Sequence, residues 1–382
     1  MQRNRMRFFS LEDMATEYSG DTSRRAPGHG TLSRMRVGFD TSPLCRPHPP
    51  GIVRVVRETM CALEERGNLD IVRLAPDDGV PVRRWRQSIL PRTVGERDLV
   101  GVHSFLSAFP WRGAGRRVQT IHELPWKHGV AENAGWRHRL WASWGARRAD
   151  AVIVATERVA RDLGRRLAID GGNVHLVPWG VAPHFNEEAP AGTLDEPLLA
   201  RYRLPDGPLA ICLGANRPKK NLAAVLHGLE QVHQRGAVQL HLVISGADSP
   251  QLRKDLGLVS RLGLTRWVST PGEIPEEDLP GLLRLAAVVP VLSRSEGFGL
   301  PALEALACGT PVVVSAGSAQ SEVAGSAGIE VDPDDPGSVA DGFERAVATR
   351  EAVRYSLPEH VAPFRWERTA EAIEKIWERL AR

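Results

Sequence analysis

Glu296 and Glu304 enclose the segment EGFGLPALE, which reads as a tight loop entering a helix. Pro301 suits the first turn of that helix, where its missing N–H group has no structural cost. A loop of this kind offers the free N–H groups of a helix terminus to an anion. The two carboxylates would repel phosphate, so we expect them to accept hydrogen bonds from hydroxyl groups. The pattern therefore favours a ligand with phosphates in its middle and polyol at both ends, as in a nucleotide sugar.

A basic loop lies earlier in the chain, after the apolar strand pattern of residues 209–214. It contains Arg217, Lys219 and Lys220, and a helix pattern follows over residues 222–232. A strand, a basic loop and a helix form a second arrangement that suits an anion. We favour phosphate binding by Lys220, helped by Arg217, over a solvated basic turn. Lys219 is the alternative source of the second positive charge.

Two histidines follow short strand patterns in the first half of the chain, His103 after residues 98–102 and His122 after residues 117–121. In doubly wound folds the carboxyl ends of the strands border the ligand crevice, so both side chains are expected near it. We favour a functional role for His122 and a hydrogen-bonded structural role for His103.

The EGFGLPALE segment, followed by the strand pattern GTPVV, resembles the Glu-x7-Glu signature of the family 4 retaining glycosyltransferases. A capped helix in an unrelated α/β protein is the alternative interpretation. Lys220 and Asn221 also match the Gly-x5-Lys-Asn pattern of that family, counted from Gly214. The resemblance covers residues 35–382 and is strongest over residues 209–314.

Residues 120–123, Thr-Ile-His-Glu, are similar to the Thr-x-His-Asp segment of the family, with Glu123 in place of the aspartate. A further match is weak: where the family has a Gly-x-Gly-Arg loop near the donor diphosphate, this chain keeps only Gly51 and Arg54. A simple loop-to-helix turn, with the helix pattern starting at Val55, explains these residues equally well. Relatives with a similar Gly-Ile-x-Arg start often transfer mannose.

The resemblance implies a role for each matched residue. Glu296 would bind the hydroxyl groups of the transferred sugar, Glu304 the ribose of the nucleotide, and His122 the donor sugar. Positive charges and N–H groups would stabilise the leaving diphosphate in place of a metal ion, so no cofactor is expected. The residues implied in this role are Arg217, Lys220, Phe298, Gly299 and Leu300, with Gly51 close to the diphosphate.

The fold class that the resemblance implies is α/β, of the GT-B type: two Rossmann-like doubly wound domains that face a central cleft. A length of 382 residues also favours two domains. The expected organisation is a disordered extension (1–34), an N-terminal acceptor domain (35–185), a linker (186–208), a C-terminal nucleotide-sugar domain (209–364) and a terminal helix that returns to the N-terminal domain (365–382).

The composition is that of an ordinary globular protein, with 42% hydrophobic and 25% charged residues. The net charge of +3 indicates no nucleic-acid partner. No apolar run reaches transmembrane length. We expect no secretory signal, because the first residues lack a basic segment followed by an apolar one. These features favour a cytoplasmic protein.

Cys45, Cys61, Cys212 and Cys308 lack the spacing of zinc ligands. The last three lie in apolar patterns and are expected to be buried. An Asp-x-Asp segment at residues 332–334 could suggest a metal site, but its place before a helix pattern favours a turn and a helix cap.

Residues 136–148 combine Trp136, Trp141 and Trp144 with four arginines. A basic aromatic helix can lie on an anionic membrane. We favour a core helix whose arginines face solvent. Peripheral contact with the inner membrane face is the alternative, because many relatives use lipid-linked acceptors.

The expected function is transfer of a hexosyl group, with mannose as the hint, from a nucleotide-diphosphate sugar to a hydroxyl group of a glycan, lipid-linked or small-molecule acceptor. The resemblance implies retention of the anomeric configuration. Two alternatives stay open at this stage. One is a related GT-B epimerase or phosphorylase, and the other is a non-catalytic subunit that binds nucleotide sugars.

Overall fold

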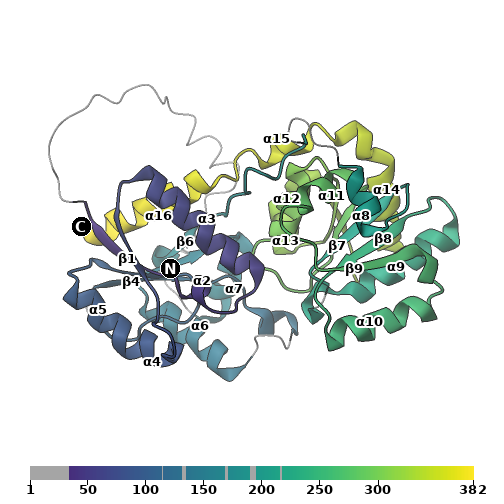
Figure 1. Cartoon of the computed structure of the whole chain (residues 1–382). Coiled ribbons are helices and arrows are strands. Elements are labelled where there is room, and N and C mark those ends of the chain that lie inside the picture. Colours follow the sequence, from purple (N-terminus) through teal and green to yellow (C-terminus); the bar gives the residue numbers. More distant parts are fainter. Residues whose placement is uncertain (1–33, 114, 131–134, 168–170, 190–194, 216) are drawn as a thin grey trace, which may run out of the picture. The chain divides into compact units, whose positions relative to one another are not determined.

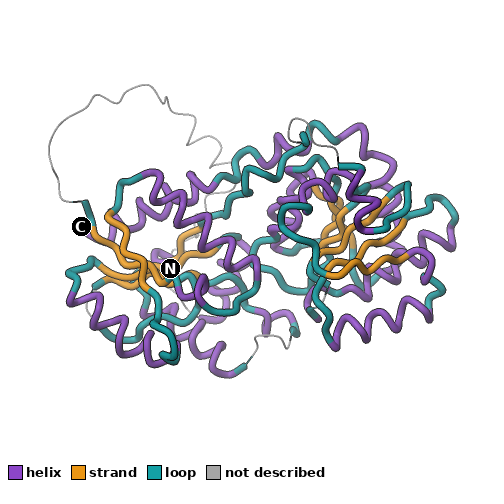
Figure 2. Tube along the Cα trace, viewed as in Figure 1, coloured by secondary structure: helices purple, strands orange, loops and turns teal. Residues whose placement is uncertain are grey.

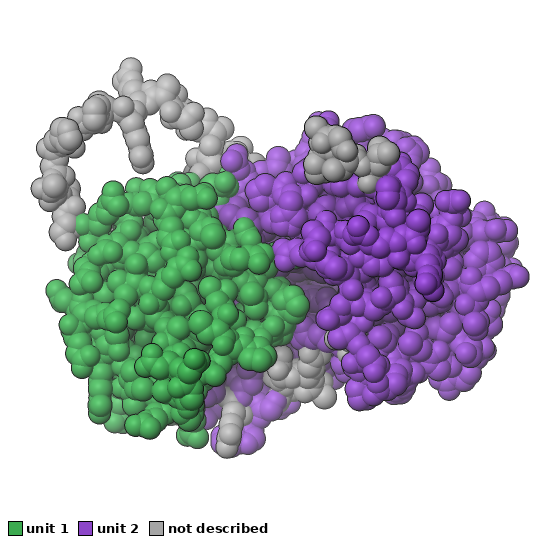
Figure 3. All heavy atoms as spheres, viewed as in Figure 1, with its two compact units in different colours: residues 1–121, 143–177, 367–382 green, residues 122–142, 178–366 purple. Residues whose placement is uncertain are grey.

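The computed structural model describes residues 34–113, 115–130, 135–167, 171–189, 195–215 and 217–382. All but the last residue of the extension expected at 1–34 thus lie outside the described residues. By packing, the chain forms two compact units (Figure 3). Unit 1 comprises Met1–Ile121, Ser143–Val177 and Glu367–Arg382, and unit 2 comprises His122–Ala142 and Pro178–Trp366. The domain boundaries proposed from the sequence stay a prediction.

Unit 1 is built on a six-stranded sheet with helices packed around it (Figures 1 and 2). The strand order is β2-β1-β3-β4-β5-β6, and every neighbouring pair is parallel. The strands are β1 (Arg36–Asp40), β2 (Asp70–Leu74), β3 (Gly101–Ser104), β4 (Arg116–Thr120), β5 (Ala151–Val154) and β6 (Val174–Leu176). In the register of the sheet, Val37 of β1 lies between Ile71 and Gly101. Helical segments connect consecutive strands, as is usual for parallel pairs, except between β3 and β4, where the described part of the connection is a loop.

The helices in the first half of the chain are α2 (Ser42–Cys45), α3 (Pro50–Arg66), α4 (Val82–Arg84), α5 (Leu90–Glu96), α6 (Trp136–Arg148) and α7 (Glu157–Leu167). Shorter turns are the π-helix η1 (Trp85–Ile89) and the 3-10 helices η2 (Pro125–His128) and η3 (Gly171–Asn173). Helix α3 begins five residues before the predicted start at Val55, because Pro50 supplies a pre-set first helical position. It ends at Gly67, which has a φ of 60°.

The last helix, α16 (Trp366–Ala381), packs in unit 1 from residue 367 onward. Its apolar residues Ile373, Ile376 and Trp377 are buried. The carboxylate of Glu374, buried on the same helix, accepts hydrogen bonds from Arg66 at 2.8 and 3.0 Å and from Asn68 at 3.0 Å. Because the carboxylate of Glu374 is buried, these contacts fix α16 to the end of α3.

Unit 2 contains two three-stranded parallel sheets that a backbone bridge between Ala210 and Val288 joins. Their strands are β7 (Leu209–Leu213), β8 (His241–Ser245), β9 (Val268–Gly272), β10 (Val289–Val291), β11 (Val312–Ser315) and β12 (Gly328–Val331). With the bridge, the order is β9-β8-β7-β10-β11-β12, which is a doubly wound arrangement. The winding direction reverses between β7 and β10.

The helices of unit 2 cover this sheet and supply most of its apolar core. They are α8 (Pro197–Tyr202), α9 (Leu222–Arg235), α10 (Pro250–Arg261), α11 (Leu279–Leu285), α12 (Leu300–Ala307), α13 (Ala319–Ala324), α14 (Pro336–Val353) and α15 (Leu357–Val361), with the 3-10 turns η4 (Pro218–Lys220), η5 (Thr265–Trp267) and η6 (Gly325–Ala327). Gly228 lets α9 and α14 approach closely, because a Cβ atom there would meet Val339 and Phe343. Helix α11 buries most of its residues, including Leu282, Leu283 and Arg284.

Helix α6 has a buried face and exposed arginines at positions 139, 147 and 148, as predicted, but two of its tryptophans lie outside that face. Trp136 and Trp144 of α6 are 70% and 45% exposed, because the small residues Ala142 and Ala146 form the buried face of this helix instead. The predicted burial of Cys61 is wrong. Cys61 is exposed, since it lies on the opposite face of α3 from the buried Met60 and Leu63. Across the described part of the chain, no helix has the length and apolarity needed to cross a membrane.

Candidate active site

The reversal of the strand order in unit 2 brings two loops together at the carboxyl ends of β7 and β10. The first loop leads from Gly214, with a φ of 65°, to Lys220. The second leads from Val291 through Glu296 to helix α12. The N–H group of Arg294 in the second loop donates a hydrogen bond to the carbonyl oxygen of Lys219 in the first, at 2.8 Å. Ligands of doubly wound folds bind at this point of the sheet.

A cluster of two lysines and two glutamates lies where these loops meet. The Nζ atom of Lys220 is 2.8 Å from Oε1 of Glu296. The Nζ atom of Lys219 is 2.9 Å from both carboxylate oxygens of Glu123 and 3.4 Å from Oε2 of Glu296. The hydroxyl group of Ser295 also donates to Glu123, at 3.4 Å. Because no side chain of the four is more than 16% exposed, these ion pairs are poorly screened by solvent.

The charges in the cluster shift the pKa values of its members. Burial would raise the pKa of Glu296, but the positive charges of Lys220 and Lys219 outweigh it and lower this pKa to about 2. Burial raises the pKa of Glu123, and the charge of Lys219 opposes that rise. For Lys219, burial favours the neutral amine, yet Glu296 and Glu123 raise its pKa. Glu296 is therefore held as a carboxylate and Lys219 as an ammonium ion.

His122 lies beside the same cluster, in the segment that follows β4. Its ring centroid is 5.9 Å from that of the buried Trp179. The backbone of His122 contacts Gly297 so closely that a Cβ atom at residue 297 would overlap the carbonyl oxygen of His122. The glycine in the Glu-Gly pair thus allows this approach, which sets His122 against the segment that carries Glu296.

Helix α12 begins at the same place, as the sequence predicts. Gly299 is its N-terminal cap residue and has a φ of 102°, and Pro301 lies in its first turn. Gln320 supports the preceding segment, because its amide donates to the carbonyl oxygens of Val291 and Ser293 at 3.3 and 2.9 Å. An α12 N-terminus in this position has N–H groups suited to an anion.

The predicted donor-binding residues thus fall into groups. Lys220, Glu296 and the start of α12 belong to one region of unit 2, while Gly51 lies in unit 1, in the first turn of α3 rather than in a loop. Phe298 is buried and meets the ring of Phe364 edge-on, at 5.9 Å between centroids. Glu304 is 3% exposed within α12. The remaining predicted residues of this region are Arg217, which is half-buried, and Leu300, the first residue of α12.

Sequence reasoning did not assign a role to Glu123 and gave Lys219 only an alternative one. The signal for Lys219 was its place beside Lys220 in the basic loop. The signal for Glu123 was an acidic residue directly after His122. Neither signal indicates that the two side chains form an ion pair, because 96 positions separate them in the chain.

His103 occupies the structural role predicted for it. It is fully buried within β3, and its Nε2 atom lies 2.9 Å from the hydroxyl oxygen of Thr120 on the neighbouring strand β4. Its ring also stacks on that of Phe105, at 4.5 Å between centroids.

The Asp-x-Asp segment forms the predicted turn and helix cap. Asp332 accepts a hydrogen bond from the N–H group of Asp334 at 2.9 Å. Asp335 caps α14 by accepting from the N–H group of Gly337, also at 2.9 Å. Within the described ranges, no group of three or more His, Cys, Asp or Glu side chains is arranged to hold a metal ion.

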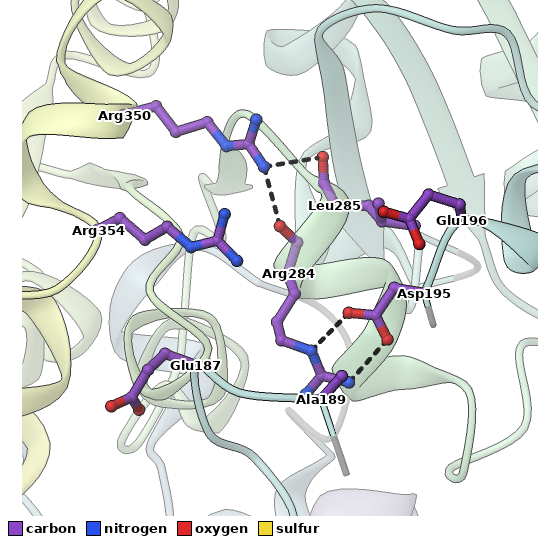
Figure 4. Close-up of a pocket in the computed structure, with 8 residues that line it drawn as sticks. All are labelled: Glu187, Ala189, Asp195, Glu196, Arg284, Leu285, Arg350 and Arg354. Atoms are coloured by element: carbon purple, nitrogen blue, oxygen red, sulfur yellow. Dashed lines mark hydrogen bonds and ion pairs between the residues drawn. The ribbon is translucent and has the colours of Figure 1, made fainter. Parts of the chain in front are cut away.

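A separate pocket of about 370 Å³ lies elsewhere in unit 2, at the end of α11 (Figure 4). Arg284 crosses it and forms a two-pronged ion pair with Asp195, at 2.6 and 2.9 Å. Arg350 donates to the carbonyl oxygens of Arg284 and Leu285. The predicted site residues are not among those that line it, which are Glu187, Ala189, Asp195, Glu196, Arg284, Leu285, Arg350 and Arg354. This pocket is therefore distinct from the predicted site.

Two units with parallel α/β sheets, one of which reverses its strand order at a cluster of lysines and glutamates, have the GT-B fold of many glycosyltransferases. Sucrose-phosphate synthase from Thermosynechococcus elongatus has a similar fold, with a TM-score of 0.73 and 22% identity over 91% of this chain and 99% of that one.

The chain belongs to the family 4 glycosyltransferases. Residues 200–356 match the family described as "Glycosyl transferases group 1", and residues 55–185 match "Glycosyltransferase Family 4". The D-inositol 3-phosphate glycosyltransferase of Corynebacterium jeikeium is 30% identical over 74% of this chain and 72% of its own length. The O-antigen chain mannosyltransferase B of Escherichia coli is 34% identical over 38% of each chain. The protein is thus an enzyme that transfers sugars.

Proposed function

We propose that this enzyme transfers a hexosyl group from a nucleotide-diphosphate sugar to an acceptor hydroxyl group with retention of anomeric configuration. The observation that carries the proposal is the contact of 2.8 Å between Lys220 and Glu296. It joins a cation suited to a diphosphate and a carboxylate suited to sugar hydroxyl groups at the switch point of a doubly wound sheet.

Lys220 binds the diphosphate in this proposal, with Arg217 and the N–H groups of residues 298–300 beside it. When the diphosphate contacts Lys220, it replaces the carboxylate of Glu296 as the partner of the ammonium group. Glu296 then accepts hydrogen bonds from the hydroxyl groups of the sugar. His122 orients that sugar, and Glu304 binds the ribose.

The reaction needs no protein nucleophile. The acceptor oxygen attacks the anomeric carbon on the face that the diphosphate leaves, so the C–O bond to phosphate breaks as the new C–O bond forms. The proton of the acceptor hydroxyl passes to an oxygen of the leaving diphosphate. Lys220 and the N-terminus of α12 stabilise the negative charge that develops there, which is the work that a metal ion does in other glycosyltransferases. The activity is therefore proposed to be independent of added metal.

Mannose is the proposed sugar. The Gly51-Ile52-Val53-Arg54 start of α3 supports it, and so does the name of the mannosyltransferase from Escherichia coli. The acceptor is proposed to be a hydroxyl group of a glycan, a lipid-linked sugar or a small polyol. The relatives named above act on inositol 3-phosphate and on an O-antigen chain, which are acceptors of these kinds.

The test starts with the nucleotide. Thermal-shift measurements with GDP, UDP, ADP and dTDP identify the cognate base, because a ligand that binds only the folded state raises the melting temperature by mass action. The cognate nucleotide sugars are then incubated with polyol and glycan acceptors in the presence of EDTA. Product anomers are assigned by NMR. Transfer with retention supports the proposal, and an inverted anomer or a strict need for metal contradicts it.

The same incubations separate the alternative activities. An epimerase would convert the nucleotide sugar without an acceptor, and a phosphorylase would require free phosphate. A binding subunit would be stabilised by a nucleotide yet turn over none of its sugars.

A further inference from the structure

Lys219 occupies a different position from Lys220, although the two are adjacent in the chain. Its side chain is only 5% exposed and lies between two carboxylates, with contacts of 2.9 Å to both oxygens of Glu123 and 3.4 Å to Glu296. Lys220 is more exposed, at 14%, and its Nζ atom pairs with Glu296. Lys219 is thus the more buried lysine of the two, and its charge is matched by two carboxylates rather than one.

Lys219 also joins three segments that are far apart in the chain. Its side chain contacts Glu123, the residue after His122, and it contacts Glu296 in the loop after β10. The carbonyl oxygen of Lys219 accepts a hydrogen bond of 2.8 Å from the N–H group of Arg294, which lies in the loop after β10. All these residues belong to unit 2. One side chain therefore links the segments that carry the two residues proposed to contact the donor sugar.

A phosphate-binding role for Lys219 conflicts with this geometry. If its ammonium group turned to a diphosphate, Glu123 would lose both of its contacts with Lys219 and would remain a buried carboxylate without that cation. Leaving a buried charge uncompensated is strongly unfavourable. Lys220 meets no such obstacle, because the hydroxyl groups of the sugar can replace it as partners of Glu296.

We propose that Lys219 is a positioning residue, which holds Glu296 and the segment of His122 in place through Glu123 while Lys220 alone exchanges its carboxylate for the diphosphate. This inference rests on the proposed function. It adds a division of labour between two neighbouring lysines and assigns a purpose to Glu123.

The division of labour predicts different kinetic effects for two matched variants. In Lys220→Met, the dissociation constant for the cognate nucleoside diphosphate rises by about tenfold or more, because a charge-assisted contact is lost. In Lys219→Met, that constant changes by less than about threefold, while kcat falls by roughly 10- to 100-fold because the sugar-binding groups shift by a fraction of an ångström. Lys254→Met, at an exposed lysine of α10, is the control for loss of charge.

The pH profile of kcat provides a readout that a merely structural role would not move. Glu123 faces the charges of Lys219, Glu296 and Arg217, and Glu296 faces those of Lys220 and Lys219. Removal of the Lys219 charge raises the pKa of both carboxyl groups. The acidic limb of the profile is therefore expected to move to higher pH in Lys219→Met and to stay in place in Lys219→Arg, which should also recover most of kcat.

A double-mutant cycle between Lys219 and Glu123 measures their pairing without any assay of activity. Glu123→Gln and Lys219→Met should each lower the melting temperature, and the double variant should lose less than the sum of the two. The double variant removes both charges and leaves neither carboxylate nor ammonium group of this pair unmatched. It can therefore be used for kinetic measurements if Lys219→Met alone folds poorly.

The outcomes separate the inference from the proposed function. A wild-type enzyme that transfers no sugar from any donor contradicts the proposed function, and the cycle still reports on the pair. An additive cycle overturns the inference. An active wild type overturns it as well if Lys219→Met weakens nucleotide binding as much as Lys220→Met, or if it leaves kcat and the pH profile unchanged.

Discussion

The ammonium group of Lys220 lies 2.8 Å from Oε1 of Glu296, although the two residues are 76 positions apart in the chain. One residue follows β7 and the other follows β10, the two strands between which the sheet of unit 2 reverses its winding. The cation and the carboxylate are thus partners of each other. Under the proposed function they become the partners of a diphosphate and a sugar, so that binding the donor exchanges one ion pair for two new contacts.

This contact predicts that removing Glu296 and removing Lys220 affect different steps, sugar transfer in the first case and nucleotide binding in the second. Glu296→Gln should reduce transfer by about 10²-fold or more, since an interaction with the sugar that strengthens in the transition state is weakened. Its affinity for the free nucleoside diphosphate should be unchanged or increased, because the carboxylate no longer competes for Lys220. Isothermal titration with the nucleotide and initial-rate kinetics measure both effects. Weaker nucleotide binding by Glu296→Gln would contradict the exchange of partners.

A second prediction concerns the close approach of Gly297 to His122. Gly297→Ala should lower the free energy of unfolding by about 1–3 kcal/mol, because the added methyl group overlaps the carbonyl oxygen of His122 and the two segments must separate. Activity should fall with it. Gly257→Ala is the matched control, since a Cβ atom there meets nothing within 4 Å and Gly257 is inside helix α10. The control should gain up to about 1 kcal/mol. Urea unfolding of both variants checks the difference.

A third prediction concerns acid. The lysines lower the pKa of Glu296 to about 2, against 4.5 for an unperturbed glutamate. A carboxyl group whose pKa is lower in the folded state stabilises the fold above its unfolded pKa and loses this contribution as pH falls toward the folded value. The difference in unfolding free energy between the wild type and Glu296→Gln should therefore be largest above about pH 5 and shrink from pH 4.5 toward 2. A difference that stays constant over this range would show that the carboxylate is not held by the lysines.

A fourth prediction uses the four cysteines. Burial raises the pKa of the thiols of Cys212 and Cys308 to about 12, whereas Cys45 and Cys61 are exposed. Because the thiolate is the reactive form, a thiol reagent at pH 8 should modify two cysteines in the native protein and four after unfolding. Peptide mass spectrometry identifies the modified positions. Rapid labelling of Cys212 or Cys308 in the native state would contradict the burial of these side chains.

Local patterns predicted many elements because their signals are contained in a few neighbouring residues. The loop of the EGFGLPALE segment enters a helix as predicted, with Pro301 in the first turn of α12. The predicted turn forms at residues 332–334, and the next residue, Asp335, caps α14. A cap or a proline at the first turn acts within one turn of chain, so the sequence contains everything that such a prediction needs.

Which side of a helix faces the core was harder to predict. Trp144 is large and apolar, yet Ala142 and Ala146 occupy the buried face of α6. Cys61 likewise lies on the exposed face of α3. Burial depends on the space that neighbouring elements leave, and that space is a property of the packed unit rather than of the residue.

By itself, the sequence determined the family, the types of residue available for a diphosphate and a sugar, and most of the helices and strands that carry them. Only the tertiary structure decided that Lys219 pairs with Glu123 and Lys220 with Glu296, over separations of 96 and 76 positions. The reason is that strand order sets which loops meet, and strand order results from the packing of whole helices and strands rather than from any short run of residues.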